Sequence, residues 1–322
     1  FQSIWIHLYI HLTISYNQEK YIIEHLESIR YQIENYGYGR KFAYILADDG
    51  SEDGTVGLAQ RWMKENDSLF CEVKILDSGK NRGIVTNYLR GINEVTTETY
   101  KCLAADDLYF KNNVIDLLND SDIVLSPTLF FSDSREALRG KNMFYYGCAG
   151  KRGKALIKAV RNDLKYYCGI QAPGSFMKRD ITQDRGLQKF LGNFKWIEDY
   201  PQWIYIFNQY QKSISVKLAT DIYILYRADT GISTKNGQRN QLFLDEEQRI
   251  KKMTGNRREK YGKFLNVYRY LNFFKRKYID YIKINTNSEA KEIRHNYEKA
   301  RKEAEDYLCF LDKKASCFIK NM

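Results

Sequence analysis

The sequence is poor in the side chains that bind soft metals or form crosslinks. It contains only four histidines, and its six cysteines are scattered with no CxxC pair. A metal site built from Cys and His is therefore disfavoured. Free cysteines in a chain without an export pattern are typical of a reducing compartment, so the sequence predicts a cytoplasmic protein.

Long apolar stretches are also missing. No run approaches the roughly 18 residues that a membrane-spanning helix needs. The first residues show no basic segment followed by an apolar core and a small-residue cleavage site, which disfavours an export signal. Neither GxxxxGK[ST] nor GxGxxG occurs, so neither of these phosphate-binding loops accounts for nucleotide binding.

The chain of 322 residues is long enough for one large domain or two modest ones, and its 43% hydrophobic and 28% charged residues are typical of soluble globular proteins. Its net charge of +11 is unevenly spread. Residues 251–322 hold 19 of the 51 Lys and Arg but only 9 of the 40 Asp and Glu. The basic character therefore belongs to the C-terminal part of the chain.

Strand and helix patterns alternate through the first 127 residues. The expected strands are 6–15, 41–49, 71–77, 99–107 and 122–127, and the expected helices are 19–32, a segment after 51 with Ser51 or Asp53 as its N-cap, and 84–92. Strands separated by single helices predict an α/β fold with a mostly parallel, doubly wound sheet. In such sheets ligands bind at the carboxyl ends of the strands, where three polar loops follow here.

The remaining chain divides by pattern. Residues 128–234 are irregular and aromatic-rich, residues 235–240 form a polar linker, and helical patterns continue from there to residue 322. We therefore predict a domain over residues 4–234, with a donor half at 4–127 and an acceptor half at 128–234, followed by a basic helical extension at 241–322.

Two adjacent carboxylates, Asp106 and Asp107, end the strand pattern "YKCLA", with no basic residue within three positions of either. One interpretation is a loop cap, which is the common role of such a pair. The other is a site for a metal ion and a phosphate, since divalent cations prefer hard oxygen ligands. The pair alone leaves both interpretations open.

The sequence resembles the family 2 glycosyltransferases of the GT-A fold, the bacterial enzymes that build capsule and O-antigen sugars. The stretches that carry the resemblance are "TISYNQEKYIIEHLESI", "ADDGSEDGT", "NRGIVTNYLRGI", "AADDLYF" and "WIEDYPQW", in the family's order and spacing. They cover about residues 10–233. The resemblance implies a Rossmann-like sheet that binds a nucleotide-sugar.

The resemblance also implies roles for the loops after the strands. Ser15, Tyr16, Asn17 and Glu19 would surround the base, and Asp49 would accept a hydrogen bond from the N3–H of uracil, which favours a UDP-sugar donor. Asp48 is expected to serve the turn alone. The segment containing Asn81, Arg82 and Gly83 would pass near the diphosphate, although a solvated loop charge is the alternative for Arg82.

By the same resemblance, Asp107 is the metal ligand and Asp106 faces the ribose. The cation would be Mn²⁺ or Mg²⁺, which neutralises the charge of the leaving diphosphate. Many relatives carry another Asp two residues before the last one, where this chain has Ala105. The other ligands are therefore expected to be phosphate and water.

Asp199 resembles the family's general base, with Glu198 as its supporting neighbour. An inverting transfer needs a carboxylate that removes the proton of the acceptor hydroxyl. The alternative is a capping pair before a helix that Pro201 opens. Given the earlier motifs, we favour the base.

The segment "QAPGSFMKR" resembles a loop beside the donor and acceptor sugars, in which Gly174 and Ser175 are the candidate contacts. Trp196, Trp203 and Tyr205 could stack on sugars, while core packing is expected for at least two of them. In "YRADTGIS" the family's usual His is missing and Asp229 stands near its place, which leaves the role of Asp229 open.

The basic tail contains a helical stripe of apolar residues flanked by Lys and Arg. The stripe consists of Phe264, Tyr268, Leu271, Phe274, Tyr278 and Ile282. It predicts either a helix at an anionic membrane surface or a helix packed on the catalytic domain. Nucleic acid binding is disfavoured because no recognition motif accompanies the charge. For residues 289–307, which mix both charges, a solvated or pairing helix is expected.

Together these features predict a metal-dependent, inverting glycosyltransferase of polysaccharide biosynthesis. The expected donor is a UDP-sugar, and the expected acceptor is a glycan or lipid-linked glycan at the inner face of the membrane. The enzyme alternative is a nucleotidyltransferase, which would carry a Gly/Arg/Lys-rich loop where this chain has "SYNQEKY". The other alternative is an inactive relative that binds a nucleotide-sugar or assembles partners, against which Asp106, Asp107 and Asp199 argue.

Overall fold

The computed structural model describes residues 8–140, 142–165, 167–210, 213–228, 241–253, 274–275 and 278–322. Its centre is a four-stranded sheet in the order β3-β2-β1-β4, in which every neighbouring pair is parallel. The strands are β1 (Leu8–Ser15), β2 (Lys41–Asp48), β3 (Glu72–Asp77) and β4 (Tyr100–Ala104). The predicted parallel α/β sheet is thus confirmed.

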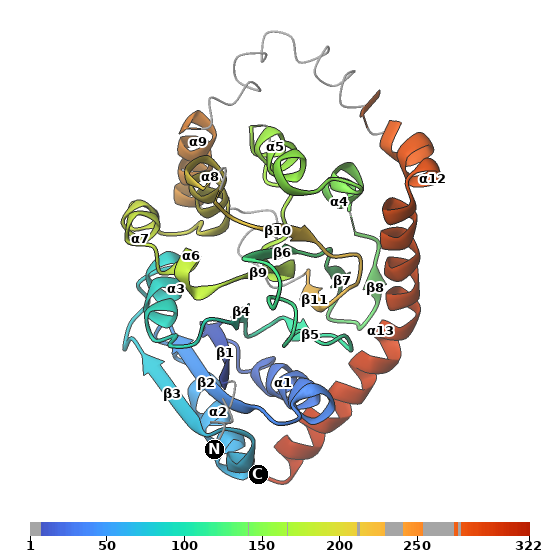
Figure 1. Ribbon diagram of the computed structural model, residues 1–322. Coiled ribbons are helices and arrows are strands. Elements are labelled where there is room, and N and C mark those ends of the chain that lie inside the picture. Colours follow the sequence, from blue (N-terminus) through green and yellow to red (C-terminus); the bar gives the residue numbers. More distant parts are fainter. Residues whose placement is uncertain are drawn as a thin grey trace, which may run out of the picture.

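Helices cover both faces of this sheet (Figure 1). They are α1 (Ile22–Tyr36) and α2 (Thr55–Glu65), followed by a short η1 (Asp67–Leu69), and α3 (Ile84–Asn93). Side chains alternate between the two sides of a strand. Leu12 and Ile45 accordingly pack in one core cluster with Ile92 of α3, whereas Tyr44 packs in another with Leu26 of α1.

The N-cap of helix α2 is neither of the two predicted residues. Its N-cap position is Gly54, and Asp53 instead accepts a hydrogen bond from the backbone N–H of Thr55 at 3.0 Å. The second carboxylate oxygen of Asp53 accepts from the N–H of Glu19 at 3.1 Å. Ser51 likewise links the two loops, since its hydroxyl oxygen accepts from the N–H of Asn17 at 2.8 Å. Both candidate caps therefore join loops together.

Two smaller sheets follow the central one. The first has the order β10-β6-β9 and the second β5-β11-β7-β8, with both parallel and antiparallel pairs. Their strands are β5 (Leu108–Tyr109), β6 (Ile123–Leu125), β7 (Leu129–Phe131), β8 (Ala137–Leu138), β9 (Ser175–Met177), β10 (Val216–Leu218) and β11 (Ile224–Arg227). The expected fifth strand, β6, therefore pairs outside the central sheet, because segments distant in sequence supply its partners.

Short helices surround these sheets on the side away from β1–β3 (Figure 1). They are α4 (Met143–Cys148), α5 (Gly153–Leu164), η2 (Ala172–Gly174), α6 (Arg179–Thr182), α7 (Arg185–Leu191) and α8 (Asp199–Gln209). Buried residues of α5 and α8, among them Leu156 and Trp203, belong to the same core cluster as Leu12 and Ile45. The irregular middle region thus shares a core with the sheet.

The C-terminal part forms α9 (Gln241–Met253), η5 (Tyr278–Lys283), α12 (Ile284–Thr286) and the long α13 (Ser288–Lys320). Helix α13 runs along one side of the molecule, past β8 and on to α1 (Figure 1). Its residues Tyr307, Leu308 and Leu311 are buried in a third cluster with Leu108 and Phe131. Of the two alternatives expected for residues 289–307, a solvated or a pairing helix, the solvated one is therefore wrong, since small and apolar residues recur on one buried face.

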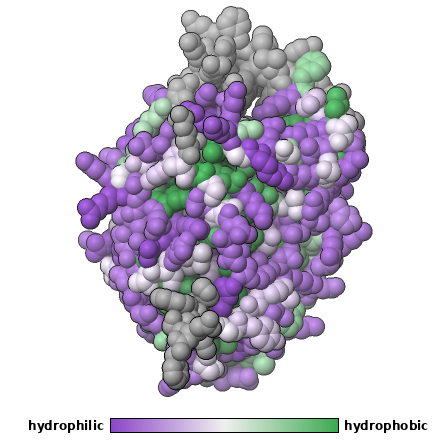
Figure 2. Space-filling view, in the orientation of Figure 1, coloured by the Kyte–Doolittle hydropathy of each residue, from purple (hydrophilic) through white to green (hydrophobic). Residues whose placement is uncertain are grey.

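Hydrophilic residues cover most of the face shown in Figure 2, and the hydrophobic ones that show gather in its upper middle part. In the part of the chain that is described, no helix is both long enough and apolar enough to cross a membrane. The cysteines are all unpaired thiols, as expected from their scatter.

Candidate functional site

The parallel register brings the predicted site loops to one edge of the central sheet. Ser15 pairs with Asp48 at the ends of β1 and β2, and Ile14 pairs with Ala104 at the end of β4. Beyond these pairs, the N–H of Asp49 donates to the carbonyl of Ser15 at 2.9 Å. The three polar loops therefore open side by side, which confirms the prediction from their positions after the strands.

Asp48 is buried and serves the structure of these loops. Its carboxylate accepts from the hydroxyl groups of Ser15 and Ser51, both at 2.6 Å, and from the N–H of Ser51 at 2.7 Å. Three donors hold its carboxylate inside the β2–α2 turn. This arrangement agrees with the turn role predicted for Asp48, and it gives the Ser15 side chain a partner within the protein.

The β1–α1 loop is tied to the β2–α2 loop by several hydrogen bonds. The side-chain oxygen of Asn17 accepts from the N–H of Glu52 at 2.9 Å, and Glu19 accepts from the N–H of Gly54 at 3.1 Å. Asn17 adopts a φ of 53°, which the amide side chain tolerates. Tyr16, between Ser15 and Asn17, is 38% exposed. Tyr16, Asn17 and Glu19 are thus all exposed at this edge, and Tyr16 adds an aromatic ring to it.

Asp49 holds the loop that precedes α3. One carboxylate oxygen accepts from the N–H of Arg82 and the other from the N–H of Gly83, each at 2.8 Å. Gly83 has a φ of +97°, and a Cβ there would meet Lys195. The Arg82 side chain itself is exposed. The structure thus brings together Asp49, Arg82 and Gly83, and it sets the segment before Trp196 against them.

Asp106 and Asp107 lie between β4 and β5 and are largely buried, with exposed fractions of 9% and 2%. Burial raises the pKa of Asp107 well above its usual range, the nearby charge of Asp106 adds to this, and Arg227 opposes it. Two carboxylates held in a poorly solvated place favour a bound cation. Their hard oxygens suit Mn²⁺ or Mg²⁺.

Helix α1 holds the backbone of this carboxylate loop through three polar residues on its buried face. The His25 ring donates from Nδ1 to the carbonyl of Asp107 at 2.6 Å, and Ser28 accepts from the N–H of Tyr109 at 3.1 Å. Gln32 accepts from the N–H of Val114 at 3.2 Å. Burial lowers the pKa of His25 to about 4, so the ring is neutral and its Nε2 accepts from a hydroxyl of β1.

Arg227, at the end of β11, holds the same loop from the other side. Its N–H donates to a carboxylate oxygen of Asp107 at 3.0 Å, and its Nε donates to the carbonyl of Asp106 at 3.1 Å. Its guanidinium also pairs with Glu24 and Asp133. Our sequence reasoning missed this residue, although a charge at the end of the apolar run "YILYR" was a usable signal.

Gly174 and Ser175 are held to the central sheet by Lys101 of β4. The buried ammonium donates to the carbonyls of Pro173 and Ser175, each at 2.7 Å. Burial lowers the pKa of Lys101 to about 8. A Cβ on Gly174 would collide with the carbonyl of Ser126. The loop therefore requires glycine here for close packing, and Ser175 is itself buried.

Glu198 and Asp199 stand at the start of α8, as the N-cap residue and the first helical residue. Both are half-buried. Burial raises the pKa of both carboxyl groups, and the charge of Asp199 raises that of Glu198 further. Asp199 accepts from the N–H of Tyr200 at 2.6 Å, while Glu198 makes no side-chain capping bond. Pro201 is the third helical residue, not the first, so the expected capping pattern is only partly met.

A second residue missed by sequence reasoning, Glu246 of α9, supports the segment before this pair. Its carboxylate accepts from the N–H groups of Lys195, Trp196 and Ile197 at 2.7, 2.7 and 3.0 Å. Three donors on one carboxylate fix the approach to Glu198. No motif marked Glu246, because it lies among other charged residues on a helix.

The three aromatic residues considered for sugar stacking differ in place. Trp203 is fully buried in the main core cluster, and Tyr205 packs against that cluster with its hydroxyl 3.3 Å from Asp184. Trp196 is partly buried beneath the ammonium of Lys195. Core packing thus holds for Trp203 and Tyr205, as expected. Asp229 lies outside the described residues.

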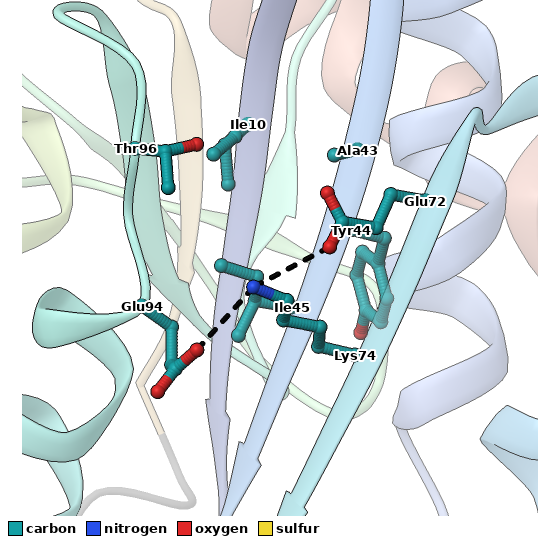
Figure 3. A pocket seen from close by; sticks show the side chains of 8 residues that line it. All are labelled: Ile10, Ala43, Tyr44, Ile45, Glu72, Lys74, Glu94 and Thr96. Carbon is teal, nitrogen blue, oxygen red and sulfur yellow. Dashed lines mark hydrogen bonds and ion pairs between the residues drawn. The ribbon is translucent and has the colours of Figure 1, made fainter.

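A small cavity in the structure is not part of this site. It has a volume of about 10 Å³, room for a single water, and Figure 3 shows it beside Lys74, which pairs with Glu72 and Glu94. Its other lining residues include Ile10 and Ala43, near the opposite ends of their strands. Within the described ranges, no three His, Cys, Asp or Glu side chains gather to hold a metal ion.

The family described as "Glycosyl transferase family 2" matches residues 12–179, just over half of the chain. Among the curated proteins, none matches.

Several solved structures are similar in fold. S. aureus TarS 1–349 in complex with UDP has a TM-score of 0.50 at 15% identity, over 78% of this chain and 71% of that one. The same protein in complex with UDP-GlcNAc gives 0.46 at 13% identity, over 96% and 88%. The mannosyltransferase PcManGT from Pyrobaculum calidifontis, in complex with GDP-Man and Mn²⁺, gives 0.45 at 13% identity, over 94% and 78%.

Proposed function

Because this chain belongs to glycosyl transferase family 2 and is a glycosyltransferase, we propose that it transfers a sugar from a UDP-sugar to a glycan hydroxyl with inversion. The observation that carries the proposal is the meeting of the Asp49, Asp106 and Asp107 loops at the carboxyl edge of one parallel sheet. A nucleotide-sugar would lie across this edge. That the acceptor is a glycan in polysaccharide biosynthesis is proposed from the motifs alone.

The preference for uridine rests on Asp49 and on fold similarity. Uracil presents an N3–H donor that an ionised carboxylate accepts. Each oxygen of Asp49 accepts one backbone hydrogen bond, and one of them also accepts from the Ser78 hydroxyl at 3.5 Å. A carboxylate has about four lone-pair directions in all, so capacity remains for a base. The similar S. aureus TarS was solved in complex with UDP. Tyr16, an exposed aromatic residue of the neighbouring loop, would contact the base.

A divalent cation would be held by Asp107, with Asp106 toward the ribose and with diphosphate oxygens and water completing its shell. When bound, it neutralises the charge of the departing diphosphate. The residues fit a hard cation because they supply carboxylate oxygens in a buried place. Arg227, His25 and α1 would hold the loop in position.

Asp199 would be the general base, and Glu198 its neighbour. The carboxyl group of Asp199 has a pKa raised by burial, which makes it a stronger base at neutral pH than an exposed Asp. It would accept the proton of the acceptor hydroxyl as that oxygen attacks the sugar. Gly174, Ser175 and Trp196 would lie beside the sugars.

The tail would bring the enzyme to an anionic membrane surface, at the inner face if the enzyme is cytoplasmic. Of the apolar stripe, Phe274, Tyr278 and Ile282 are described, and each is about half exposed. Ile279, between them, is buried. The three described stripe residues therefore face outward, and the neighbouring Lys275 is exposed as well, which favours the membrane over packing on the catalytic domain. Phe264, Tyr268 and Leu271 lie outside the described residues.

A panel of nucleoside diphosphates tests the donor assignment. A ligand that binds only the folded protein raises the melting temperature. We expect UDP with Mn²⁺ to raise it more than GDP, CDP or ADP with Mn²⁺, and more than UDP with a chelator. If no diphosphate raises it under either condition, the proposed nucleotide site is wrong.

A further inference from the structure

A buried guanidinium lies directly behind the proposed metal ligand. The Arg227 side chain is 2% exposed, and its guanidinium carbon lies 4.3 and 4.5 Å from the ring centroids of Tyr21 and Phe131. Its three nitrogens reach three different partners. Nε donates to the carbonyl of Asp106, one terminal nitrogen pairs with Glu24 at 2.7 Å, and the other pairs with Asp133 at 3.0 Å.

These contacts fix the orientation of the Arg227 guanidinium more than they stabilise the folded protein. A buried ion pair gains little net free energy, because desolvation offsets the attraction. A planar guanidinium whose three nitrogens are all engaged and that lies against two aromatic rings, however, is held in one orientation. Since the Arg227 backbone also donates to the Asp107 carboxylate, both residues of the carboxylate pair are fixed by this one residue.

The same network reaches the C-terminal helix. The second carboxylate oxygen of Glu24 pairs with Arg135, and Arg135 pairs in turn with Asp312 of α13 at 2.6 Å. Helix α13 also contacts the strand that follows the carboxylates directly. The hydroxyl of its Tyr307 donates to the carbonyl of Tyr109 at 3.1 Å.

We propose that Arg227 is a positioning residue for the Asp106–Asp107 loop, and that α13 shares this task through the Glu24–Arg135–Asp312 chain of ion pairs. The inference rests on the proposed function, since it concerns how that site holds cation and nucleotide. It gives the C-terminal helix, which lies outside the matched family region, a part in donor binding.

Arg227→Lys tests the proposal, because lysine keeps the charge but loses the planar set of donors. Titration calorimetry would measure the affinity of UDP, GDP, CDP and ADP with Mn²⁺ and with chelator. For the diphosphate that the wild-type protein binds best, we expect the gain in affinity from Mn²⁺ to fall at least tenfold in this variant. The affinity in chelator should stay within about twofold. Arg61→Lys, an exposed arginine of α2, is the matched control.

A second variant keeps the test open if Arg227→Lys does not fold. Asp312 is 52% exposed, so Asp312→Asn should fold, and we expect its Mn²⁺-dependent gain to fall at least threefold. Asp306→Asn, an exposed residue of the same helix, should leave the gain unchanged.

Three results would overturn the inference. The first is an unchanged Mn²⁺-dependent gain in affinity in Arg227→Lys. If that variant does not fold, an unchanged gain in Asp312→Asn counts in the same way. An equal loss of affinity with Mn²⁺ and with chelator would show a general structural role only. If the wild-type protein binds no diphosphate at all, the proposed function itself fails, before any variant is compared.

Discussion

At the scale of single residues, the carboxylates of the site were readable and their supports were not. Asp106 and Asp107 are marked in the sequence by two charges at the end of an apolar strand. Arg227, which holds them, lies 120 residues further on, and no local pattern relates the two. His25, Ser28 and Gln32 were detectable only as polar residues on the otherwise apolar face of a predicted helix, a signal whose meaning depends on the strand that packs there.

Asp199→Asn tests the proposed general base. The amide cannot accept the proton, so we expect turnover to fall by roughly 10²–10⁴-fold, the usual scale for a lost general base. Nucleotide affinity should remain within about twofold, because the side chain would face the acceptor. Turnover can be followed as UDP release from a UDP-sugar panel.

The matched control is Asp180→Asn, since Asp180 has a side chain that is 78% exposed on α6. A collapse of UDP affinity in Asp199→Asn would make this residue a donor ligand or a structural cap, and the base would have to be another group.

His11 predicts how stability depends on pH. It is buried, faces His25, Tyr9 and Tyr109, and burial lowers its pKa to about 3. A histidine whose pKa is lowered in the folded protein stays neutral there. In the unfolded protein the same histidine binds a proton below about pH 6.5. Its contribution to stability is therefore fully present above pH 6.5 and is lost as the pH falls toward 3, by about 1.4 kcal/mol per unit.

His11→Phe should remove that part of the slope. Denaturant unfolding at pH 7, 5.5 and 4.5 would show a shallower loss of stability than in the wild-type protein. His295→Phe, at an exposed position on α13, should keep the wild-type slope. Equal slopes in all three proteins would mean that His11 is protonated in the folded state.

At the scale of elements, the long helices and buried strands followed from periodicity, and the short strands did not. The central strands have apolar runs that alternate between two covered faces. By contrast, β5 (Leu108–Tyr109) and β8 (Ala137–Leu138) have two residues each, too few for any period to show. Likewise, the three residues of β6 predicted a strand correctly but could not indicate which sheet it joins.

Helix α9 should stabilise the segment before Glu198 through Glu246. Glu246→Gln removes the negative charge that accepts three backbone N–H groups, and we expect the free energy of unfolding to fall by about 1–3 kcal/mol. Asp245→Asn, next to it on the helix, is the control, since Asp245 is exposed and accepts from the side chain of Gln241 at 2.8 Å, and it should change stability by less than about 0.5 kcal/mol.

Denaturant unfolding of the two variants makes the comparison. A similar effect of both substitutions would mean that stability depends on the net charge of the helix, and not on the hydrogen bonds that Glu246 accepts from residues 195–197.

The outward stripe of the tail predicts binding to anionic vesicles. Each Lys or Arg near such a surface contributes about 1 kcal/mol, an attraction that salt screens. We expect the protein to sediment with phosphatidylserine liposomes at low salt and to be released at high salt. Replacing Phe274 and Ile282 by Ser should weaken sedimentation severalfold.

Leu242→Ser provides the control, since Leu242 is 58% exposed on α9 but lies outside the stripe. If the wild-type protein ignores anionic liposomes, the exposed stripe serves another purpose. Sedimentation that is insensitive to both stripe substitutions would assign the binding to charge alone.

At the scale of the whole molecule, the C-terminal helix cannot be treated as an appendage. Tyr307, Leu308 and Leu311 are buried against Leu108 and Phe131, so α13 supplies a large part of the third core cluster. A chain ending near residue 240 would expose that cluster beside the carboxylate loop. The domain boundaries predicted from the sequence describe changes of pattern along the chain, whereas the packing crosses them. Composition alone cannot show packing across a predicted boundary, because that packing depends on which faces of the helices and strands meet in the fold.

The fold and the motifs support one central claim, that Asp107 makes nucleotide binding depend on a divalent cation. Titration calorimetry of UDP against the wild-type protein and Asp107→Ala, each with Mn²⁺ and with chelator, tests it most directly. The account predicts that Mn²⁺ strengthens UDP binding to the wild-type protein at least tenfold and that Asp107→Ala loses both the strengthening and most of the affinity. Equal UDP affinity of the wild-type protein in Mn²⁺ and in chelator would contradict it.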